Sequence, residues 1–350
     1  MRIAQIAPLA ESVPPTLYGG TERVVSWLTE DLVRRGHRVT LFASGDSKTK
    51  AELVPVVPRA LRLDPTVKDC LPHNLRLIDA VRARADEFDV IHFHVDLLHY
   101  PSFRDMADRV VTTLHGQLDF PDLRIFYREF AEMPLVSISH SQRAPMPPVN
   151  WLATVHHGMP KDLYRPCLSP RGDYFAFVGR ICPEKGIEDA IDIAERLQIP
   201  LKIAAKVDNA DRAYFEARVK PRLSSQWVEF IGEVNDRQKN EVLGNALAML
   251  FPICWPEPFG LVMIEAMACG TPVIAFNCGS VPEITEDGVT GFVVKDVGAA
   301  LSAASKVAQL DRNLIRKRFD YRFTVEQMTT KYLDVYARLL DARLGAVAAA

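Results

Sequence analysis

Residues 257–273 read Glu257-Pro-Phe-Gly-Leu-Val-Met-Ile-Glu265-Ala-Met-Ala-Cys-Gly-Thr-Pro-Val273. Glu257 lies in a loop rich in proline and aromatic residues, whereas Glu265 lies in an apolar stretch that predicts a buried helix. Carboxylates this close to an apolar core cost free energy unless polar groups meet them. A ligand rich in hydroxyl groups would meet both of them.

Short apolar runs alternate with helix-like segments on both sides of this stretch, which is typical of a parallel sheet covered by helices. In the first half, strands are expected at Arg2–Ala7, Arg38–Ala43, Asp89–Phe93, Val110–Leu114 and Leu135–Ile138. A second series is expected at Tyr174–Val178, Leu201–Ala205, Val228–Ile231, Ala248–Phe251 and Pro272–Ala275. The sequence therefore predicts an α/β fold of two doubly wound units in tandem.

The junction between the two units is expected where Pro160, Pro166, Pro170 and Gly172 cluster. We assign residues 1–165 to the first domain, 166–322 to the second, and 323–350 to a C-terminal helix that packs back toward the first. All nine histidines precede Gly158, so the two halves also differ in composition.

Length and composition limit the classes of protein. The 350 residues are 48% hydrophobic and 25% charged, which suits a globular chain with two cores. A net charge of -2 gives no general attraction to nucleic acid or to an anionic membrane. The six cysteines show no metal or redox spacing, and no apolar run is long enough to span a bilayer. We expect a cytoplasmic protein with free thiols and no nucleic-acid partner.

Gly19-Gly20-Thr21 precedes a helix expected over Glu22–Arg35. Two glycines let a ligand approach the backbone, and a helix N-terminus favours an anion. The alternative is a tight turn in which Thr21 caps the helix. The chain has no G-x-G-x-x-G, no P-loop and no Asp-x-Asp motif, which argues against dinucleotide binding and against one common way of holding a metal on a diphosphate.

Two further segments suit an anionic ligand. Arg180 and Lys185 flank the loop after a predicted strand, and they would present a guanidinium fork and a point charge to one diphosphate. The alternative is a surface loop with solvated charges. Gly260-Leu261-Val262 open the helix that carries Glu265, and the free N–H groups of such a turn form an anion site.

The two glutamates also have a simpler interpretation, with Glu257 as a solvated loop acid and Glu265 as a capping partner. His115 follows the end of a strand, where ligands bind in open α/β sheets, although a lone histidine is often structural. His92 and His94 share one face of their strand and could join His115 at a metal. No carboxylate or cysteine completes that set at ligand spacing, so we predict no metal site.

Together these motifs resemble the GT4 family of retaining glycosyltransferases, which have the GT-B fold. The resemblance covers nearly the whole chain and rests on Glu257-x7-Glu265 with Ala266-Met267-Ala268-x-Gly270-Thr271-Pro272-Val273, on Gly179-Arg180-x4-Lys185-Gly186, on Gly19-Gly20-Thr21-Glu22, on Gly36-His37-x-Val39-Thr40 and on His157-Gly158-Met159. It implies two Rossmann-like domains facing across a cleft, the first on the acceptor side and the second binding a nucleotide sugar.

The resemblance implies four catalytic residues. Arg180 and Lys185 would hold the donor diphosphate, Glu257 the transferred sugar near its 3- and 4-hydroxyls, and His115 the sugar 6-hydroxyl. Glu265 would bind the ribose hydroxyls. The full donor-binding set that it implies is Gly19, Gly20, Arg180, Lys185, Val234, Glu257, Phe259, Gly260, Leu261, Val262 and Glu265. Within this set the glycines and the helix turn would approach the phosphates, and Val234 would contact the base.

The resemblance further implies front-face transfer of a hexosyl unit from a nucleotide sugar, with UDP as the expected nucleotide and GDP or ADP as alternatives. Neither a cofactor nor a metal is expected. The acceptor, a saccharide, a lipid-linked molecule or a small molecule, would dock on the first domain at Asp46–Leu71 and the loops near Tyr18, Asp96 and Phe120. Because residues 46–71 are irregular and mix apolar with basic side chains, a peripheral contact with the inner face of the membrane is also conceivable, with a surface loop as the simpler alternative.

Three other functions fit parts of the pattern. A GT-B nucleotide-sugar epimerase would use the same donor but would need acid and base groups at the sugar C2. A phosphorylase would need a pyridoxal-bearing lysine, for which no motif is present. A non-catalytic nucleotide-sugar-binding protein is disfavoured because the phosphate and sugar residues are both intact.

Overall fold

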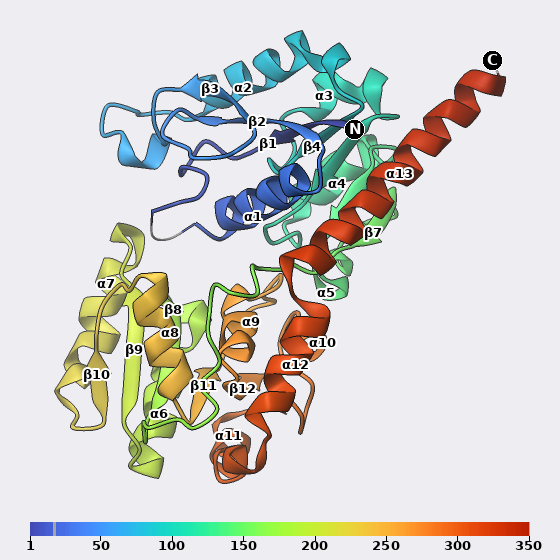
Figure 1. Ribbon diagram of the computed structural model, residues 1–350. Coiled ribbons are helices and arrows are strands. Elements are labelled where there is room, and N and C mark those ends of the chain that lie inside the picture. Colours follow the sequence, from blue (N-terminus) through green and yellow to red (C-terminus); the bar gives the residue numbers. More distant parts are fainter. Residues whose placement is uncertain (17–18, 350) are drawn as a thin grey trace. The chain divides into compact units, whose positions relative to one another are not determined.

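The computed structural model describes residues 1–16 and 19–349, with side chains up to residue 343, so the docking position expected near Tyr18 lies outside the described residues. Two compact units make up the chain (Figure 1). Unit 1 comprises Met1–Pro160 and the C-terminal segment from Val325, and unit 2 comprises Lys161–Thr324. The unit boundaries thus lie at 160/161 and 324/325, where the sequence assignment placed them at 165/166 and 322/323.

Unit 1 is built on a seven-stranded sheet with the order β3-β2-β1-β4-β5-β6-β7. Its paired strands all run parallel. The strands are β1 (Arg2–Ile6), β2 (Arg38–Ser44), β3 (Glu52–Val57), β4 (Val90–Phe93), β5 (Val110–Thr113), β6 (Leu135–Ser137) and β7 (Trp151–Thr154). The helices are α1 (Gly20–Arg34), α2 (Leu71–Ala83), α3 (Tyr100–Phe103), α4 (Pro121–Glu129), α5 (His140–Arg143) and α13 (Val325–Ala349).

Unit 2 repeats this winding in a six-stranded sheet with the order β10-β9-β8-β11-β12-β13, also parallel. The strands are β8 (Phe175–Arg180), β9 (Leu201–Lys206), β10 (Val228–Phe230), β11 (Ala248–Phe251), β12 (Val273–Phe276) and β13 (Gly291–Val294). The helices are α6 (Ile187–Leu197), α7 (Arg212–Tyr214), α8 (Asp236–Asn245), α9 (Leu261–Ala268), α10 (Val281–Ile284), α11 (Val297–Ala304) and α12 (Arg312–Arg322). The predicted α/β class with two doubly wound sheets is confirmed.

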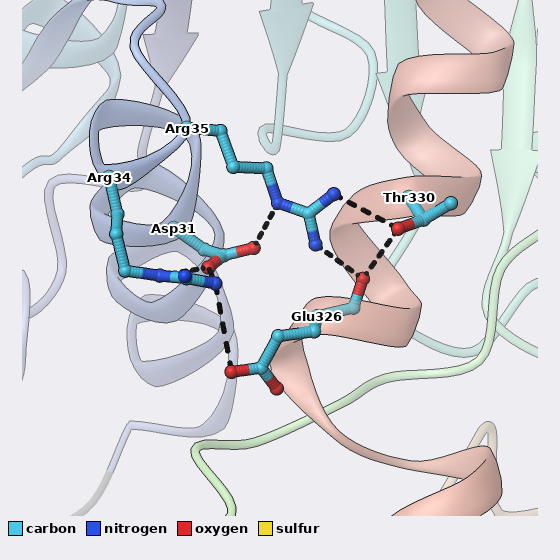
Figure 2. Close-up of polar contacts among 5 residues, drawn as sticks. All are labelled: Asp31, Arg34, Arg35, Glu326 and Thr330. Carbon is cyan, nitrogen blue, oxygen red and sulfur yellow. Dashed lines mark hydrogen bonds and ion pairs between the residues drawn. The ribbon is translucent and has the colours of Figure 1, made fainter.

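The last helix, α13, belongs to unit 1, where it lies beside α1 (Figure 2). Arg35 donates to the hydroxyl of Thr330 at 3.0 Å and to the carbonyl oxygen of Glu326 at 2.7 Å. Asp31 orients that guanidinium through a 2.8 Å contact, and Arg34 approaches the Glu326 carboxylate at 3.7 Å. Hydrogen bonds and an ion pair therefore connect the start of α13 to the end of α1.

Three strands were not expected from the sequence. β3 lies within residues 46–71, which the sequence analysis treated as irregular; Pro55 is tolerated there because β3 is an edge strand. β7 and β13 are short, and they also lie at the ends of their sheets. In the part of the chain that the structure describes, no helix combines the length and apolarity that crossing a membrane requires.

Candidate active site

Arg180 is the last residue of β8, and its Cα partner in the sheet is Lys206, the last residue of β9. Its guanidinium lies 3.9 Å from the Oδ2 atom of Asp208 and 3.5 Å from that of Asp211. Lys206 contacts the other oxygen of Asp208 at 2.9 Å. The sequence analysis missed these two aspartates, although their position just after a strand was a usable signal.

Lys185 and Glu257, which the sequence analysis assigned to one site, form an ion pair in the structure. Glu257 also accepts a 3.0 Å hydrogen bond from the indole N–H of Trp255, a residue that the sequence analysis did not single out. The Lys185 ammonium lies 5.3 Å from the centre of the Trp255 ring. Because Glu257 is only 9% exposed, the alternative of a solvated loop acid is wrong.

Glycines hold this part of the chain in place. Gly186 follows Lys185 at φ +69°, and a Cβ there would lie 1.9 Å from the carbonyl oxygen of Pro252. Gly279, at φ +61°, packs so closely that a Cβ would lie 2.3 Å from the backbone nitrogen of Glu257. The next residue, Ser280, donates its N–H to the Glu257 carbonyl at 2.9 Å. The backbone of Glu257 is therefore clamped by the turn after β12.

Phe259 and the start of α9 continue this loop. Phe259 is buried, and its carbonyl oxygen accepts a 2.8 Å hydrogen bond from the hydroxyl of Ser280. Gly260 is the N-cap of α9 at φ +78° and contributes no capping side chain. Leu261 and Val262 form the first turn and are half-buried. The first N–H groups of a helix have no partner within that helix, so this turn retains donors for an anion.

Glu265 is buried within α9 and has a cationic partner. Its Oε1 atom lies 2.8 Å from the ammonium of Lys239 and accepts a 3.3 Å hydrogen bond from Tyr164. The Tyr164 hydroxyl also lies 2.9 Å from Asp236. Glu265 is thus paired with a lysine from α8, and the alternative in which it caps a helix is wrong.

The remaining donor-side predictions fall on turns. Gly19 is the N-cap of α1 and has φ 150°, so the alternative that Thr21 caps this helix is wrong. A Cβ at Gly19 would lie 2.8 Å from that of Pro15, and Gly20 begins the helix two residues earlier than expected. Val234 is half-buried in the loop before α8, and its predicted contact with a base stays a prediction.

His115 lies two residues after β5, in a loop whose backbone is hydrogen-bonded to the side chain of Gln142. The Gln142 amide donates to the carbonyl oxygens of Leu114 and Gly116 at 2.9 and 2.8 Å. The His115 Nε2 atom lies 2.9 Å from Nδ1 of His94, and its ring is stacked on that of His157 with centroids 5.2 Å apart. Burial lowers the pKa of His115 to about 3, so the ring is neutral at physiological pH.

The three histidines considered as metal ligands do not form such a site. Both ring nitrogens of His92 are engaged, by Tyr336 and Thr113, each at 2.7 Å. Among residues 1–16 and 19–349, no group of three or more His, Cys, Asp or Glu side chains is placed to hold a metal ion. Metal independence of the reaction stays a prediction.

Comparison with known proteins adds to this geometry. The family model described as Glycosyltransferase Family 4 matches residues 18–180, and that described as Glycosyl transferases group 1 matches residues 168–322. O-antigen chain mannosyltransferase C of Escherichia coli is 24% identical over 94% of this chain and 97% of that protein.

Two crystal structures share the fold over 97% of this chain. AviGT4, a glycosyltransferase of avilamycin A biosynthesis, has a TM-score of 0.74 and is 22% identical, with 98% of its own chain covered. Anabaena HepE in complex with UDP and glucose has a TM-score of 0.74 and is 17% identical, with 100% of its own chain covered.

The two parallel, doubly wound sheets and the matches to glycosyltransferase families and structures define a glycosyltransferase of the GT-B fold. The two family models together extend from residue 18 to residue 322. The chain belongs to the GT4 glycosyltransferases.

Proposed function

We propose that this enzyme is a retaining glycosyltransferase that moves a hexosyl unit from a UDP-sugar to an acceptor hydroxyl without a metal ion. One observation carries the proposal: in unit 2, Lys185 in the segment after β8 is paired with the buried Glu257 in the segment after β11. Arg180 ends β8, and the buried Glu265 lies in the helix that follows Glu257. A mannosyltransferase among the relatives and UDP with glucose in a protein of the same fold support the hexosyl unit and the nucleotide.

The leaving diphosphate needs positive charge as its bond to the anomeric carbon breaks. Arg180 and Lys185 supply two cations, and the N-terminal turn of α9 supplies N–H donors. Preorganised groups of this kind act where charge develops, and loss of one typically costs about 3–4 kcal/mol of barrier, or 10²–10³ in rate. Lys185 would exchange Glu257 for a phosphate oxygen when the donor binds.

The two glutamates then bind hydroxyl groups. Glu257, released by Lys185 but still bonded to Trp255, accepts from the 3- and 4-hydroxyls of the sugar. Glu265, oriented by Lys239 and Tyr164, accepts from the ribose hydroxyls. A carboxylate accepts several hydrogen bonds at once, which suits a pair of neighbouring hydroxyls.

In the transfer step, the bond from the anomeric carbon to the diphosphate oxygen breaks and a bond to the acceptor oxygen forms on the same face of the sugar. The electron pair of the broken bond goes to the diphosphate, which also takes the acceptor's proton. Glu257 positions the sugar and does not attack it. The nucleophile and acid of retaining hydrolases therefore have no counterpart in this scheme.

Three assignments come from the motifs alone. Gly19 and Gly20 would let the diphosphate approach the start of α1, since neither presents a side chain. Val234 would contact the base. His115, neutral and held by His94, would contact the sugar 6-hydroxyl.

The acceptor would bind to unit 1, and the surface around α2 favours one with an apolar part. Leu63, Leu71 and Leu75 are 52%, 48% and 51% exposed within 13 consecutive residues, and Arg76 is exposed beside them. We propose a lipid-linked acceptor and a peripheral membrane contact at this surface. Co-sedimentation with phosphatidylglycerol vesicles tests it: replacing all three leucines by serine should abolish binding, and unchanged binding would contradict the proposal.

A donor panel tests the proposed reaction. UDP-, GDP- and ADP-hexoses are compared by thermal shift, because a ligand that binds the folded state raises the melting temperature. UDP-sugars should give the largest shift, and release of UDP should then depend on an added acceptor. Formation of an epimer of the donor sugar in the absence of acceptor would identify an epimerase instead.

A further inference from the structure

Three histidines of unit 1 belong to a chain of hydrogen bonds that the proposed function leaves largely unused. We call it the histidine relay; its members, in spatial order, are His115, His94, Gln5, Tyr336, His92, Thr113 and Tyr332. The successive contacts measure 2.9, 2.8, 3.1, 2.7, 2.7 and 3.1 Å. Every member except the half-buried His115 is at most 2% exposed, so water does not compete for these bonds.

Gln5 gives the relay a direction, because its amide has one donor end and one acceptor end. Its Nε2 atom donates to the hydroxyl of Tyr336, so its Oε1 atom accepts from Nε2 of His94. A neutral imidazole carries a single N–H. The Nδ1 atom of His94 is therefore a lone pair, and it accepts the Nε2–H of His115.

The rings are neutral because they are buried. Desolvation lowers the pKa of His92 and His94 well below the usual value for histidine and that of His115 to about 3. With its one proton committed to His94, His115 keeps a lone pair on Nδ1. This atom is buried and has no hydrogen-bond partner among the described residues. A buried polar atom without a partner requires an explanation, and a bound ligand is one.

We propose that Gln5 and His94 are positioning residues that hold His115 in its Nε2–H tautomer, so that Nδ1 offers a lone pair to a hydroxyl of the donor sugar. The second half of this inference rests on the proposed role of His115 in sugar binding. A nitrogen that only accepts favours a sugar with a free 6-hydroxyl. It disfavours a uronic acid, whose carboxylate has no proton to donate.

Gln5 and Tyr336, which lie far from His115 in the sequence, act on the Nδ1 atom of His115 through the relay. If the Gln5 amide were turned over, each bond between it and His115 would reverse, and the His115 proton would move to Nδ1. In the observed orientation the Nε2 atom of the amide donates to the hydroxyl of Tyr336, which comes from α13. The C-terminal helix thus acts on His115 through one amide group.

Nitrogen-15 NMR of histidine-labelled protein tests the tautomer without any enzymatic assay. His115→Gln identifies the His115 signals by their loss. The wild-type spectrum should show His115 as the neutral Nε2–H form between pH 6 and 8. A proton on Nδ1, or a charged ring, would overturn the relay, and this measurement needs no variant of Gln5 to fold.

Gln5→Leu removes both ends of the amide, and His115 should then become a mixture of tautomers. Thr112→Val is the matched control: it removes another buried hydrogen bond of unit 1, the 2.8 Å bond between Thr112 and His99, which lies outside the relay. It should leave the His115 tautomer unchanged. An unchanged tautomer in Gln5→Leu would show that Gln5 does not set it.

Donor kinetics separate the relay from the proposed sugar contact. The ratio of kcat/KM for UDP-glucose to that for UDP-xylose, which lacks the 6-hydroxymethyl group, should fall about tenfold in Gln5→Leu, or about 1.4 kcal/mol, and stay constant in Thr112→Val. If the tautomer changes but this ratio does not, the relay stands and the sugar contact of His115 is wrong. Equal processing of UDP-glucuronate and UDP-glucose by the wild type would also contradict that contact.

Discussion

The two sheets have the same winding but carry different polar chemistry. Beyond the strands of unit 2, the polar groups are ion pairs, among them Lys185 with Glu257 and Lys239 with Glu265. In unit 1 the histidine relay consists instead of neutral imidazole, amide and hydroxyl groups, and unit 2 has no histidine. Function is carried by sites placed on a fold and not by the fold itself. Charged pairs suit a charged diphosphate, and neutral groups suit an uncharged sugar.

The difference also has an energetic side. Buried ion pairs carry a desolvation cost that well-packed apolar residues would avoid, so they are weak evidence for stability and call for another explanation. A ligand that exchanges partners with them is such an explanation. The relay in unit 1 has the opposite character, since each of its bonds satisfies a group that would otherwise be buried without a partner.

The largest expected difference between the two units is in how much stability each loses at low pH. Burial lowers the folded-state pKa of five histidines of unit 1: His92, His94, His99, His115 and His157. Below pH 6.5 the unfolded chain therefore takes up protons that the folded chain excludes. The stability they contribute is complete above pH 6.5 and falls as the pH drops, by about 1 kcal/mol per histidine over the first pH unit. Burial raises the pKa of Glu22 and of Asp96, which acts in the opposite sense, but these are two groups against five histidines.

Hydrogen exchange measured by mass spectrometry between pH 7 and 5.5, corrected for intrinsic exchange, would follow each unit separately. Peptides of unit 1 should lose about 5 kcal/mol of protection from pH 6.5 to 5.5, while those of unit 2 stay nearly constant. An equal loss of protection in both units would show that the buried histidines do not make unit 1 more sensitive to acid than unit 2.

Loss of a unit 2 cation should have the next largest effect. Arg180→Ala or Lys185→Ala should lower the rate of nucleotide release by 10²–10³, or about 3–4 kcal/mol of barrier. Each substitution removes a positive side chain that would stabilise the leaving diphosphate. Lys202→Ala is the control, because Lys202 lies on the same sheet but has other contacts: Glu229 at 3.4 Å and the Tyr174 ring, whose centre lies 4.6 Å from the ammonium. Full activity in either site variant would mean that these cations do not serve the reaction.

Gly279→Ala tests whether the turn after β12 holds the backbone of Glu257 in place. Its Cβ would meet the Glu257 backbone at 2.3 Å and φ is +61°, so strain and overpacking should cost about 3 kcal/mol of unfolding free energy. Gly288→Ala has φ +73° but nothing within 4 Å, and it should cost only about 1 kcal/mol. Denaturant titration measures the unfolding free energy of both variants. If Gly279→Ala costs no more than Gly288→Ala, the backbone of Glu257 is not tightly packed against Gly279.

The smallest effect is expected from chelation. If Arg180 and Lys185 neutralise the diphosphate, EDTA should leave the rate of nucleotide release unchanged. A loss of activity that Mg²⁺ or Mn²⁺ restores would show that unit 2 depends on a metal as well as on its own cations.

The sequence predicted the fold class well because parallel strands are apolar on both faces and stand out as short runs. β3 was missed because Pro55 interrupts its run, and a proline is acceptable there only because the strand lies at the sheet edge. β13, Gly291–Val294, is four residues long and begins with a glycine, so it offered little signal.

The candidate site was predictable in its motifs but not in its partners. Glu257 and Glu265 stand out because they interrupt apolar or aromatic sequence. Lys239, Tyr164 and Gly279, which contact them, come from other segments, and only the folded chain brings them together. The period of two placed His92 and His94 on one face, yet nothing local indicated Tyr336, which lies 244 residues from His92.

The position of α13 has a consequence for synthesis on the ribosome. Unit 1 is discontinuous, since its buried Tyr332 and Tyr336 are translated after the whole of unit 2. Unit 2 is one continuous stretch and can fold while the chain is still growing, as domains generally do. Gln5 and His92 of unit 1 lack their partner Tyr336 until α13 leaves the exit tunnel. A nascent chain stalled before Val325 would therefore present a folded unit 2 and an incomplete unit 1.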